Sequence, residues 1–245
     1  MPISTDSIIH YTKKISSLRS ILKEGFKIKY CAEDLQLSPT NARSAHPMIS
    51  FCDIPLSNSQ QHFGTYGYYG IGLSKSWAIR NGINPVIYVD KNSRLARAIS
   101  ELLIDQRSKD LKFTKEQNKN IVAIKGFAKN YEGPLSRGTT HNLHYRFYDE
   151  REWRLVPTNE QIDGKSFAIG LKRYNDNKDR YNDPLKSLRF TFDVADISYI
   201  IVKKTKDIPN IINYLRNLYR DRCNAEELDI LFSKVCSTEQ IISDF

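Results

Sequence analysis

Cysteine is sparse in this sequence and follows no pairing pattern. Its four cysteines lie far apart and form no CxxC pair: Cys31, Cys52, Cys223 and Cys236. Such spacing suggests neither a zinc knuckle nor a disulfide framework, so we expect reduced, intracellular thiols. Two near clusters include histidine but lack a third and fourth ligand at suitable spacing: His141 with His144, and Cys52 with His62. We therefore expect no metal site.

Long apolar runs and low-complexity segments are also missing, and no secretory leader is expected. The opening stretch MPISTDSIIH has neither a basic region nor an apolar core, and no apolar run approaches the length of a membrane span. Glycine (11 residues) and proline (9 residues) are not enriched, so disorder is not expected for most of the chain. We expect a cytoplasmic protein with no membrane partner.

Positive charge is in excess. The chain has 37 Lys and Arg against 28 Asp and Glu, which gives a formal net charge of +9. This balance would attract a phosphate-rich partner such as nucleic acid or an anionic cofactor, although an ordinary basic surface explains it as well. Chains of 245 residues often share one α/β core, so we interpret residues 1–245 as a single domain.

The N-terminal pattern predicts a strand followed by a helix. Residues 7–12 (SIIHYT) are rich in β-branched and aromatic side chains, and apolar residues recur on one helical face over 14–24 until a glycine ends the pattern. Residues 31–47 have mixed polarity and two prolines, which predict a surface loop. A strand is expected at 48–52, and Pro55 would end it.

The rest of the chain alternates between predicted strands and helices. Helices are expected at 74–81, 92–107 and 208–219, strands at 71–73, 85–89, 188–192, 198–203 and, along an edge, 229–236, and a short helix after that. Periodicity does not decide between strand and helix at 121–128. Residues 143–148 and 152–156 should pair as strands around the acidic turn 149–151, and the charged stretch 172–189 should form a mobile loop or a hairpin.

Two constellations of polar side chains could carry chemistry. His10 lies in the predicted first strand, where an isolated histidine is usually structural. In YRFYDEREWRLV, Glu150 and Glu152 would share a face if both lie in a strand, and each carboxylate would raise the proton affinity of the other unless cations intervene. Suitable cations are close in sequence: Arg146, Arg151 and Arg154. A solvated, salt-bridged strand end is the competing explanation.

A glycine- and tyrosine-rich stretch covers residues 64–72. Its glycines would let the backbone approach a ligand, and Tyr66, Tyr68 and Tyr69 offer rings that could stack on a planar base. The stretch is neither a GxGxxG fingerprint with a suitably placed acidic residue nor a Walker loop. A glycine-bent strand packed by aromatic side chains explains it equally well.

Three segments together resemble the AbiGi family of abortive-infection proteins, which are usually labelled the antitoxin partner in a phage-resistance pair. The segments are IIHYTKKISSLRSILKEGF, MISFCDIPLSNSQQHFGTYGYYGIGLSKSWAIRNGINPVIYV and YDEREWRLV. They span most of the first two-thirds of the chain. The resemblance implies a bacterial phage-defence role and a cognate toxin or antitoxin protein as partner.

A more distant resemblance is to ADP-ribosyltransferases. It rests on the strand histidine His10, on the middle segment 66–76 with its neighbouring GIGLSKSWA, and on the strand glutamate Glu152. The resemblance implies an α+β fold in which two packed antiparallel or mixed sheets form a cleft with flanking helices. It also implies NAD as a substrate, because that family cleaves NAD between a histidine that binds ribose and a glutamate that stabilises the oxocarbenium-like centre.

The same resemblance implies roles for individual side chains. Glu152 would stabilise the transition state, Glu150 would orient the acceptor, and His10 would hold the ribose. Contacts to NAD would come from seven residues: His10, Tyr11, Thr12, Ser50, Tyr66, Tyr69 and Ser74. The tyrosine that stacks on nicotinamide has no unambiguous counterpart, since Tyr66 and Tyr69 could each take that position.

Two functions therefore stay open at the level of sequence. The first is an enzyme that transfers ADP-ribose from NAD to a protein or nucleic acid. The second is a non-catalytic antitoxin that holds a toxin or binds promoter DNA through the basic side chains of the charged stretch, namely Lys172, Arg173, Lys178, Arg180, Lys186 and Arg189. A shared fold does not decide between them.

Overall fold

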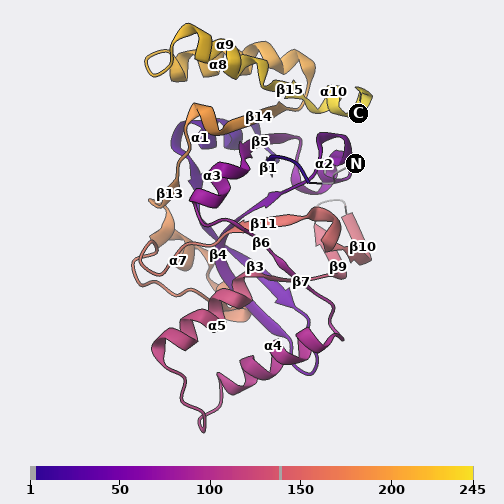
Figure 1. The fold of residues 1–245 in the computed structure, drawn as a ribbon, viewed down its shortest axis with the longest axis vertical. Coiled ribbons are helices and arrows are strands. Elements are labelled where there is room, and N and C mark those ends of the chain that lie inside the picture. Colours follow the sequence, from indigo (N-terminus) through magenta and orange to yellow (C-terminus); the bar gives the residue numbers. More distant parts are fainter. Residues whose placement is uncertain (1–3, 138–139, 245) are drawn as a thin grey trace.

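The chain folds as an α+β protein around one mixed sheet (Figure 1). The structure is a computed structural model that describes residues 4–137 and 140–244. In this part of the chain the sheet has the order β15-β14-β5-β1-β4-β11-β6, and β3 and β12 also pair with β4. Its strands are β1 (Ser7–Thr12), β3 (Lys29–Leu35), β4 (Ala42–Cys52), β5 (Tyr69–Ser74), β6 (Asn84–Pro85), β11 (Glu152–Leu155), β12 (Ile169–Gly170), β14 (Ile197–Val202) and β15 (Val235–Ser237).

Helices and three small two-stranded sheets complete the described structure. The small sheets pair β2 (Phe26–Lys27) with β13 (Arg189–Phe190), β7 (Ile87–Val89) with β8 (Ala128–Asn130), and β9 (Glu132–Arg137) with β10 (Thr140–Arg146). The helices are α1 (Ile15–Glu24), α2 (Gln60–Tyr66), α3 (Lys75–Arg80), α4 (Arg94–Asp105), α5 (Lys115–Phe127), α6 (Leu171–Asp176), α7 (Lys178–Asn182), α8 (Ile208–Tyr219), α9 (Ala225–Ser233) and α10 (Thr238–Asp244). Within these described residues, no helix is both long and apolar enough to span a bilayer.

Strand β4 belongs to two halves of the sheet. Its first part, Ala42 to Met48, pairs with β3, and its last part pairs with β11 from Ile49 and with β1 at Cys52. One strand thus carries both sets of neighbours, in an α+β structure with several sheets and helices. The prediction of a loop at 31–47 is wrong. Pro47 is tolerated in the strand because it lies where β4 is about to change partners.

The main core lies between the sheet and the helices α1, α3, α8 and α9. Strand β1 and α1 form as predicted, and α1 buries Leu18 and Leu22 against the sheet. Gly25 ends α1 with a positive φ of 83°, and a Cβ there would lie 2.6 Å from the carbonyl oxygen of Phe190. Helix α3 begins at the predicted cap, where the Ser74 hydroxyl accepts a hydrogen bond from the Trp77 amide.

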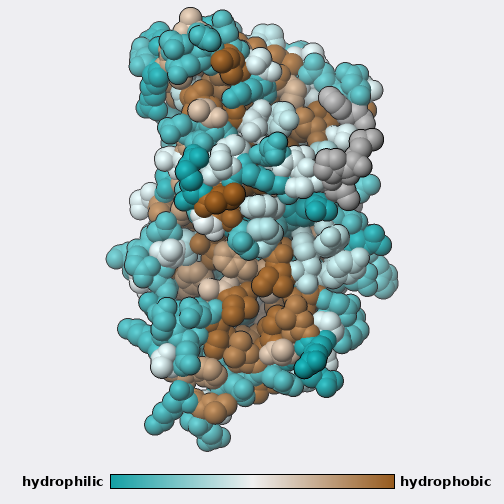
Figure 2. All heavy atoms as spheres, in the orientation of Figure 1, coloured by the Kyte–Doolittle hydropathy of each residue, from teal (hydrophilic) through white to brown (hydrophobic). Residues whose placement is uncertain are grey.

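Residues 86–130 form a separate lobe at one end of the molecule, which we call the α4–α5 lobe (Figure 1). Its own apolar cluster joins Val89, Ile99 and Ile121 to Leu35 at the distal end of β3. Figure 2 shows hydrophobic residues gathered on the surface in the region of this lobe. The exposed apolar side chains of the lobe include Ile87, Leu95, Ile104 and Ile124. The undecided run 121–128 is mostly helical, because it lies in α5 and reaches β8 at its last residue.

Three further predictions are corrected by the structure. Residues 143–148 do not pair with 152–156, because β10 pairs with β9 whereas β11 pairs with β4 and β6. The charged stretch 172–189 forms α6, α7 and a short 3₁₀ turn rather than a loop or hairpin, and buried Tyr174 anchors it. Most of 229–236 lies in α9, and a strand begins only at Val235. The predicted C-terminal helix is present as α10.

Candidate functional site

A cleft of about 770 Å³ opens between α1, the β1–β4–β11 part of the sheet, and the β9–β10 hairpin. Its volume is within the range of pockets that bind small organic ligands and cofactors. The cleft brings together side chains that are distant in sequence: His10, Ser50, Tyr66, Glu150 and Glu152. These five are candidate residues predicted from the sequence, and they come from β1, β4, α2, a 3₁₀ turn and β11.

The other predicted residues are divided between the cleft and the core. Tyr11 and Thr12 line the cleft, but the Tyr11 ring is buried and its hydroxyl donates to the Ser59 hydroxyl at 2.9 Å, which gives it a structural role. Tyr69 and Ser74 lie on β5 and are not among the residues that line the cleft. Ser74 caps α3, so its hydroxyl is engaged there.

His10 is held by the neighbouring strand. Its Nδ1 lies 2.9 Å from the carbonyl oxygen of Ser50, and because a carbonyl only accepts, Nδ1 carries the hydrogen. Phe26 and Phe51 contact the imidazole edge-on, and burial lowers the pKa of His10 below its ordinary value. At neutral pH the ring is therefore uncharged, and Nε2 keeps a lone pair with which it can accept a hydrogen bond from a ligand hydroxyl.

Glu152 is a buried carboxylate with four hydrogen-bond donors. Ser50 Oγ donates to Oε1 at 2.6 Å, Lys129 Nζ donates to Oε2 at 2.7 Å, and Arg154 donates to both oxygens at 2.8 and 3.2 Å. Burial alone would raise the pKa of Glu152, but Arg154 and Lys129 together hold it well below its ordinary value. Glu152 is thus a permanent anion in a fixed orientation.

The Glu150 carboxylate lies near that of Glu152, although Glu150 is not part of strand β11. It ends a 3₁₀ turn, and the next residue, Arg151, has a positive φ of 45° that turns the chain into β11. The expected shared strand face is therefore absent. The two carboxylates nevertheless converge, because Lys129 Nζ lies 2.9 Å from Glu150 Oε2 and 2.7 Å from Glu152 Oε2.

Lys129 is a residue that sequence reasoning missed. Its side chain is only 13% exposed, and burial would lower its pKa, but the charges of Glu152 and Glu150 raise the pKa well above the ordinary value. The lysine is therefore a fixed cation between two anions. Its one sequence signal was its place directly after the apolar run 121–128, which periodicity had left undecided.

Arg154 is the predicted cation that does enter the cluster. Its side chain is fully buried, and besides Glu152 it contacts Glu33 Oε1 at 3.2 Å and donates to the carbonyl oxygens of Gly126 and Ala128. The other two arginines point elsewhere, since Arg146 lies 3.9 Å from Asp149 and Arg151 lies over the Tyr148 ring. One guanidinium thus uses its whole fork of donors in the protein interior.

Tyr66 is the expected stacking residue that does line the cleft, but its ring is engaged. Its hydroxyl donates to Glu150 Oε1, the His62 ring stacks on it at 5.8 Å, and the Arg137 guanidinium lies 5.2 Å from its centre. Burial and the charge of Glu150 raise the pKa of Tyr66, so the hydroxyl keeps its proton. Tyr66 therefore positions Glu150 in this conformation rather than offering an open ring for stacking.

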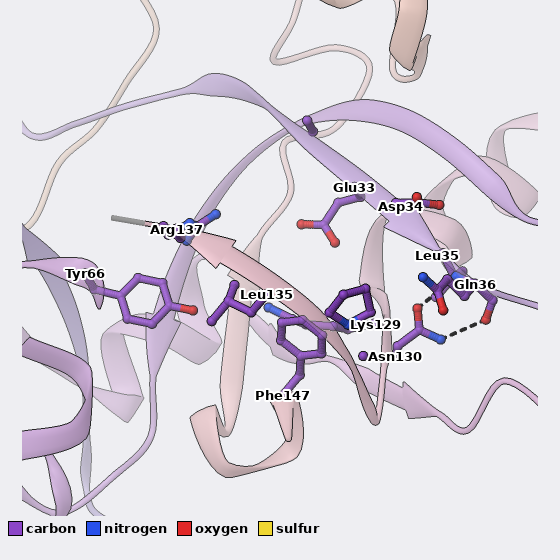
Figure 3. Close-up of a pocket in the computed structure, with 13 residues that line it drawn as sticks. Glu33, Asp34, Leu35, Gln36, Tyr66, Lys129, Asn130, Leu135, Arg137 and Phe147 are labelled. Carbon is purple, nitrogen blue, oxygen red and sulfur yellow. Dashed lines mark hydrogen bonds between the residues drawn. The ribbon is translucent and has the colours of Figure 1, made fainter. Parts of the chain in front are cut away.

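A side pocket of about 200 Å³ adjoins the cleft (Figure 3). Four residues line both cavities: Glu33, Tyr66, Lys129 and Arg137. Figure 3 shows Leu135 and Phe147 beside Lys129, and the Lys129 ammonium lies 4.8 Å from the Phe147 ring centre. Lys129 thus separates the main cleft from a smaller chamber that the β9–β10 hairpin covers.

Charge differs between the floor and the rim of the cleft. The floor carries the carboxylates of Glu33, Glu150 and Glu152, which Lys129 and Arg154 largely neutralise. The rim carries basic side chains: Lys13, Lys27, Lys29 and Arg137. Five cations and three anions line the cleft altogether, so its field favours a ligand with phosphate groups.

A metal ion has no evident place in this cluster. Among the residues that the structure describes, no group of three or more His, Cys, Asp and Glu side chains could hold one. Cys52 Sγ and His62 Nδ1, which were one of the two near clusters in the sequence, lie 3.9 Å apart. Burial raises the pKa of the Cys52 thiol, so this thiol is also a poor nucleophile.

Comparison with known proteins places the chain in a family. Residues 24–203 match the family described as "Putative abortive phage resistance protein AbiGi, antitoxin". A similar protein is the "Abortive phage resistance protein AbiGi" of Lactococcus lactis subsp. cremoris, which is 30% identical over 224 residues that cover 81% of this chain and 88% of that protein. No solved structure matches. The chain therefore belongs to the AbiGi family of abortive phage resistance proteins.

Proposed function

We propose that this abortive phage resistance protein binds NAD in the cleft and transfers ADP-ribose from it to a macromolecule. The observation that supports the proposal most is the convergence of His10, Ser50 and Glu152 in one cleft of suitable volume. The basic rim supports it as well, because Lys13 and Arg137 line the cleft and their charges would attract a pyrophosphate. A resemblance to ADP-ribosyltransferases in fold and in NAD use is part of the same proposal.

The reaction needs a fixed negative charge rather than a proton carrier. The bond between C1′ of the ribose and the nicotinamide nitrogen breaks, and nicotinamide leaves with the bonding electrons. An acceptor oxygen or nitrogen then forms a bond to C1′ and releases its proton. Positive charge grows on the ribose in between, and the Glu152 carboxylate, anionic at every physiological pH, would stabilise that charge electrostatically.

His10 and Glu150 would have separate parts in this reaction. The Nε2 lone pair of neutral His10 can accept a hydrogen bond from a ribose hydroxyl, because the Ser50 carbonyl fixes the tautomer. Glu150 would orient the acceptor from the Lys129 side of the floor. Neither tyrosine of the expected pair is free to stack on nicotinamide, since Tyr66 is engaged and Tyr69 does not line the cleft.

Glu152→Gln tests the proposal. Purified protein would be incubated with NAD labelled on its adenylate phosphate and with extract of phage-infected cells, and label in protein and nucleic-acid fractions would be measured. We expect a loss of transfer of roughly 100-fold, since one charged group aimed at the transition state contributes about that much. Glu160→Gln, which changes an exposed carboxylate, should leave transfer unchanged.

Ser50→Ala is a second variant, in case Glu152→Gln loses transfer only because it does not fold. It removes one of the donors to Glu152 but keeps both ion pairs, so we expect partial loss of transfer with a normal melting curve. Label transfer at the wild-type rate by Glu152→Gln would remove this glutamate from the mechanism. No transfer to any fraction by the wild-type protein would contradict enzymatic activity altogether.

The second candidate is a non-catalytic antitoxin that binds its cognate toxin. The saturation of Glu152 favours it, because a carboxylate with four internal donors has no acceptor position left for a substrate hydroxyl. The family description also names an antitoxin. On this proposal the ion cluster stabilises the fold, and the activity is protein recognition.

Expression in a host cell distinguishes the two candidates. An antitoxin should be harmless when expressed alone and should restore growth when its toxin partner is expressed with it. A transferase should slow growth by itself, and His10→Ala should relieve that effect. Toxicity of this chain alone, abolished by His10→Ala in a protein that still folds, would contradict the antitoxin proposal.

A further inference from the structure

Four basic side chains form a ridge on the rim of the cleft, which we call the basic ridge: Lys27, Lys29, Lys186 and Arg189. The pairing of β13 with β2 sets Arg189 opposite Lys27, and Lys29 follows two residues later. Lys27 and Lys29 line the cleft itself. The ridge therefore joins the cleft mouth to the segment that carries α6 and α7.

Side-chain contacts fix the α6–α7 segment beside the cleft. The Asn182 amide oxygen accepts a hydrogen bond from the Tyr30 backbone amide at 2.9 Å, directly next to Lys29. The Tyr174 hydroxyl donates to the Tyr30 carbonyl at 2.7 Å. This segment was expected to be a mobile loop or a hairpin, but these bonds hold it against β3. Residues 171–190 carry six Lys and Arg against three Asp, so the charge of the ridge continues along it.

The charge of the ridge is only partly neutralised. Lys186 lies 2.7 Å from Asp183, and Arg189 lies 3.5 Å from Glu24. Lys27 and Lys29 are exposed and make no ion pair with any residue that the structure describes. The pKa of Lys27 is lowered by burial and then by the charges of Lys29, Arg189 and Lys186, whereas the charge of Asp183 raises it.

We infer that the basic ridge binds the phosphate backbone of a single-stranded nucleic acid and places one nucleotide over the cleft. Closely spaced cations that contact phosphates displace condensed counterions from the nucleic acid, which is the main source of affinity in such complexes. Two of the four ridge cations, Lys27 and Lys29, have no ion-pair partner among the described residues. The strand must be single because a cleft of about 770 Å³ admits a nucleotide but not a duplex, and bases are accessible only outside the stack.

Binding of the strand does not depend on ADP-ribose transfer. That the bound strand is also the acceptor rests on the proposed function, since Glu150 and Glu152 lie at the floor below the ridge. The ridge and the carboxylates are separate sets of residues. Substitutions in the ridge therefore leave the carboxylates unchanged, and substitutions of the carboxylates leave the ridge unchanged, so their effects can be measured separately.

The test is fluorescence anisotropy with fluorescein-labelled oligouridine and oligothymidine, in the absence of NAD, over a series of KCl concentrations. The variant Lys27→Glu with Lys29→Glu should weaken binding by roughly tenfold or more, because two phosphate contacts become repulsive. The slope of log K against log salt should also fall by about 1.4, which corresponds to two contacts on a single strand. The RNA and DNA arms show which strand is preferred.

The matched control is Lys109→Glu with Lys112→Glu, which makes the same charge change at exposed positions of the α4–α5 lobe. It should bind almost as the wild type does. If both double variants weakened oligonucleotide binding equally, the effect would come from net charge alone, and the inference would be overturned. Wild-type protein that binds neither strand, or that binds the annealed duplex equally well, would also overturn it.

Glu152→Gln separates this inference from the proposed function. The variant should bind both oligonucleotides normally because its substitution lies on the floor, below the ridge. Normal binding by the wild-type protein without any transfer of label would contradict the transferase alone. Transfer that continues while the Lys27→Glu, Lys29→Glu variant binds as wild type would contradict the ridge alone.

Discussion

Lys129 connects two acidic side chains that would otherwise repel each other inside the protein. Each carboxylate loses solvation on burial, and the ammonium at 2.9 and 2.7 Å offsets that loss. Sequence could indicate that Glu150 and Glu152 would need cations, and Arg154 was among those named. Lys129 could not be identified, because it lies on a three-residue strand whose position depends on distant contacts.

Lys129→Met should destabilise the protein by about 3–5 kcal/mol, because it leaves buried carboxylates without their common cation. Methionine keeps most of the volume of the side chain, so the loss is mainly electrostatic. Urea unfolding followed by circular dichroism measures it. The exposed Lys109→Met is the control and should stay within about 0.5 kcal/mol of the wild type. Similar stability of both variants would show that the cluster does not need its lysine.

His46 should make the stability of the fold depend on pH. Its ring is fully buried, Nε2 contacts the Ser44 hydroxyl at 2.9 Å, and burial with the charges of Lys125 and Arg154 lowers its pKa to about 3. Above pH 6.5 both folded and unfolded states hold neutral histidine, so this residue adds no pH dependence there. Below pH 6.5 the unfolded chain takes up the proton more readily, and stability falls as pH falls.

Between pH 6.5 and 4.5 His46 should therefore reduce the free energy of unfolding by about 2–3 kcal/mol, at 1.36 kcal/mol for each pKa unit. His46→Gln keeps a nitrogen near Ser44 but does not titrate. Its unfolding free energy should fall less steeply over that interval, as urea titrations at several pH values would show. Parallel curves for variant and wild type would mean that another group causes the acid sensitivity.

At the scale of elements, local patterns predicted the pieces that bury one clear face. Strand β1, helix α1, the Ser74 cap and helix α8 have regular apolar spacing or a capping residue, and each formed where expected. The error at 31–47 has a different cause. Two prolines and mixed polarity look like a loop, yet β3 and β4 form there because neighbouring strands take up their hydrogen bonds.

Gly64 within α2 and Gly67 directly after it should respond in opposite ways to the same substitution. Gly67 follows the helix with a φ of 126°, and a Cβ there would lie 2.2 Å from the Thr12 carbonyl oxygen, so Gly67→Ala must displace β1. Gly64 is helical with open space around it, so Gly64→Ala should raise stability by about 0.5–1 kcal/mol. Thermal unfolding of both variants gives the comparison, and a stable Gly67→Ala protein would contradict this account of the turn.

The whole molecule consists of a large core and the smaller α4–α5 lobe. The lobe has its own apolar cluster and joins the rest through the two short parallel strands β7 and β8 and the distal ends of β3 and β4. Sequence predicted α4 but not this division, because no linker or shift in composition marks it. The convergence of His10 and Glu152 in one cleft was anticipated only through the family resemblance.

The α4–α5 lobe should open more readily than the central strands. Native-state hydrogen exchange should show lower opening free energies for amides of α4 and α5 than for β1, β5 and β14, because the lobe buries fewer apolar side chains. Measurement at low denaturant with mass spectrometry resolves these segments. Equal protection of the lobe and the central strands would indicate one cooperative unit.

Arg154 connects the α4–α5 lobe to the carboxylates of the cleft. Two of the bonds made by its guanidinium go to Gly126 and Ala128, at the point where α5 ends and β8 begins, and the remaining donors orient Glu152 and Glu33. If the α4–α5 lobe moved away from the sheet, Arg154 would lose its hydrogen bonds to the Gly126 and Ala128 carbonyls. Its guanidinium could then shift and no longer hold the Glu152 carboxylate in place. Movement of α4 and α5 would then be coupled to the cleft through the Arg154 guanidinium.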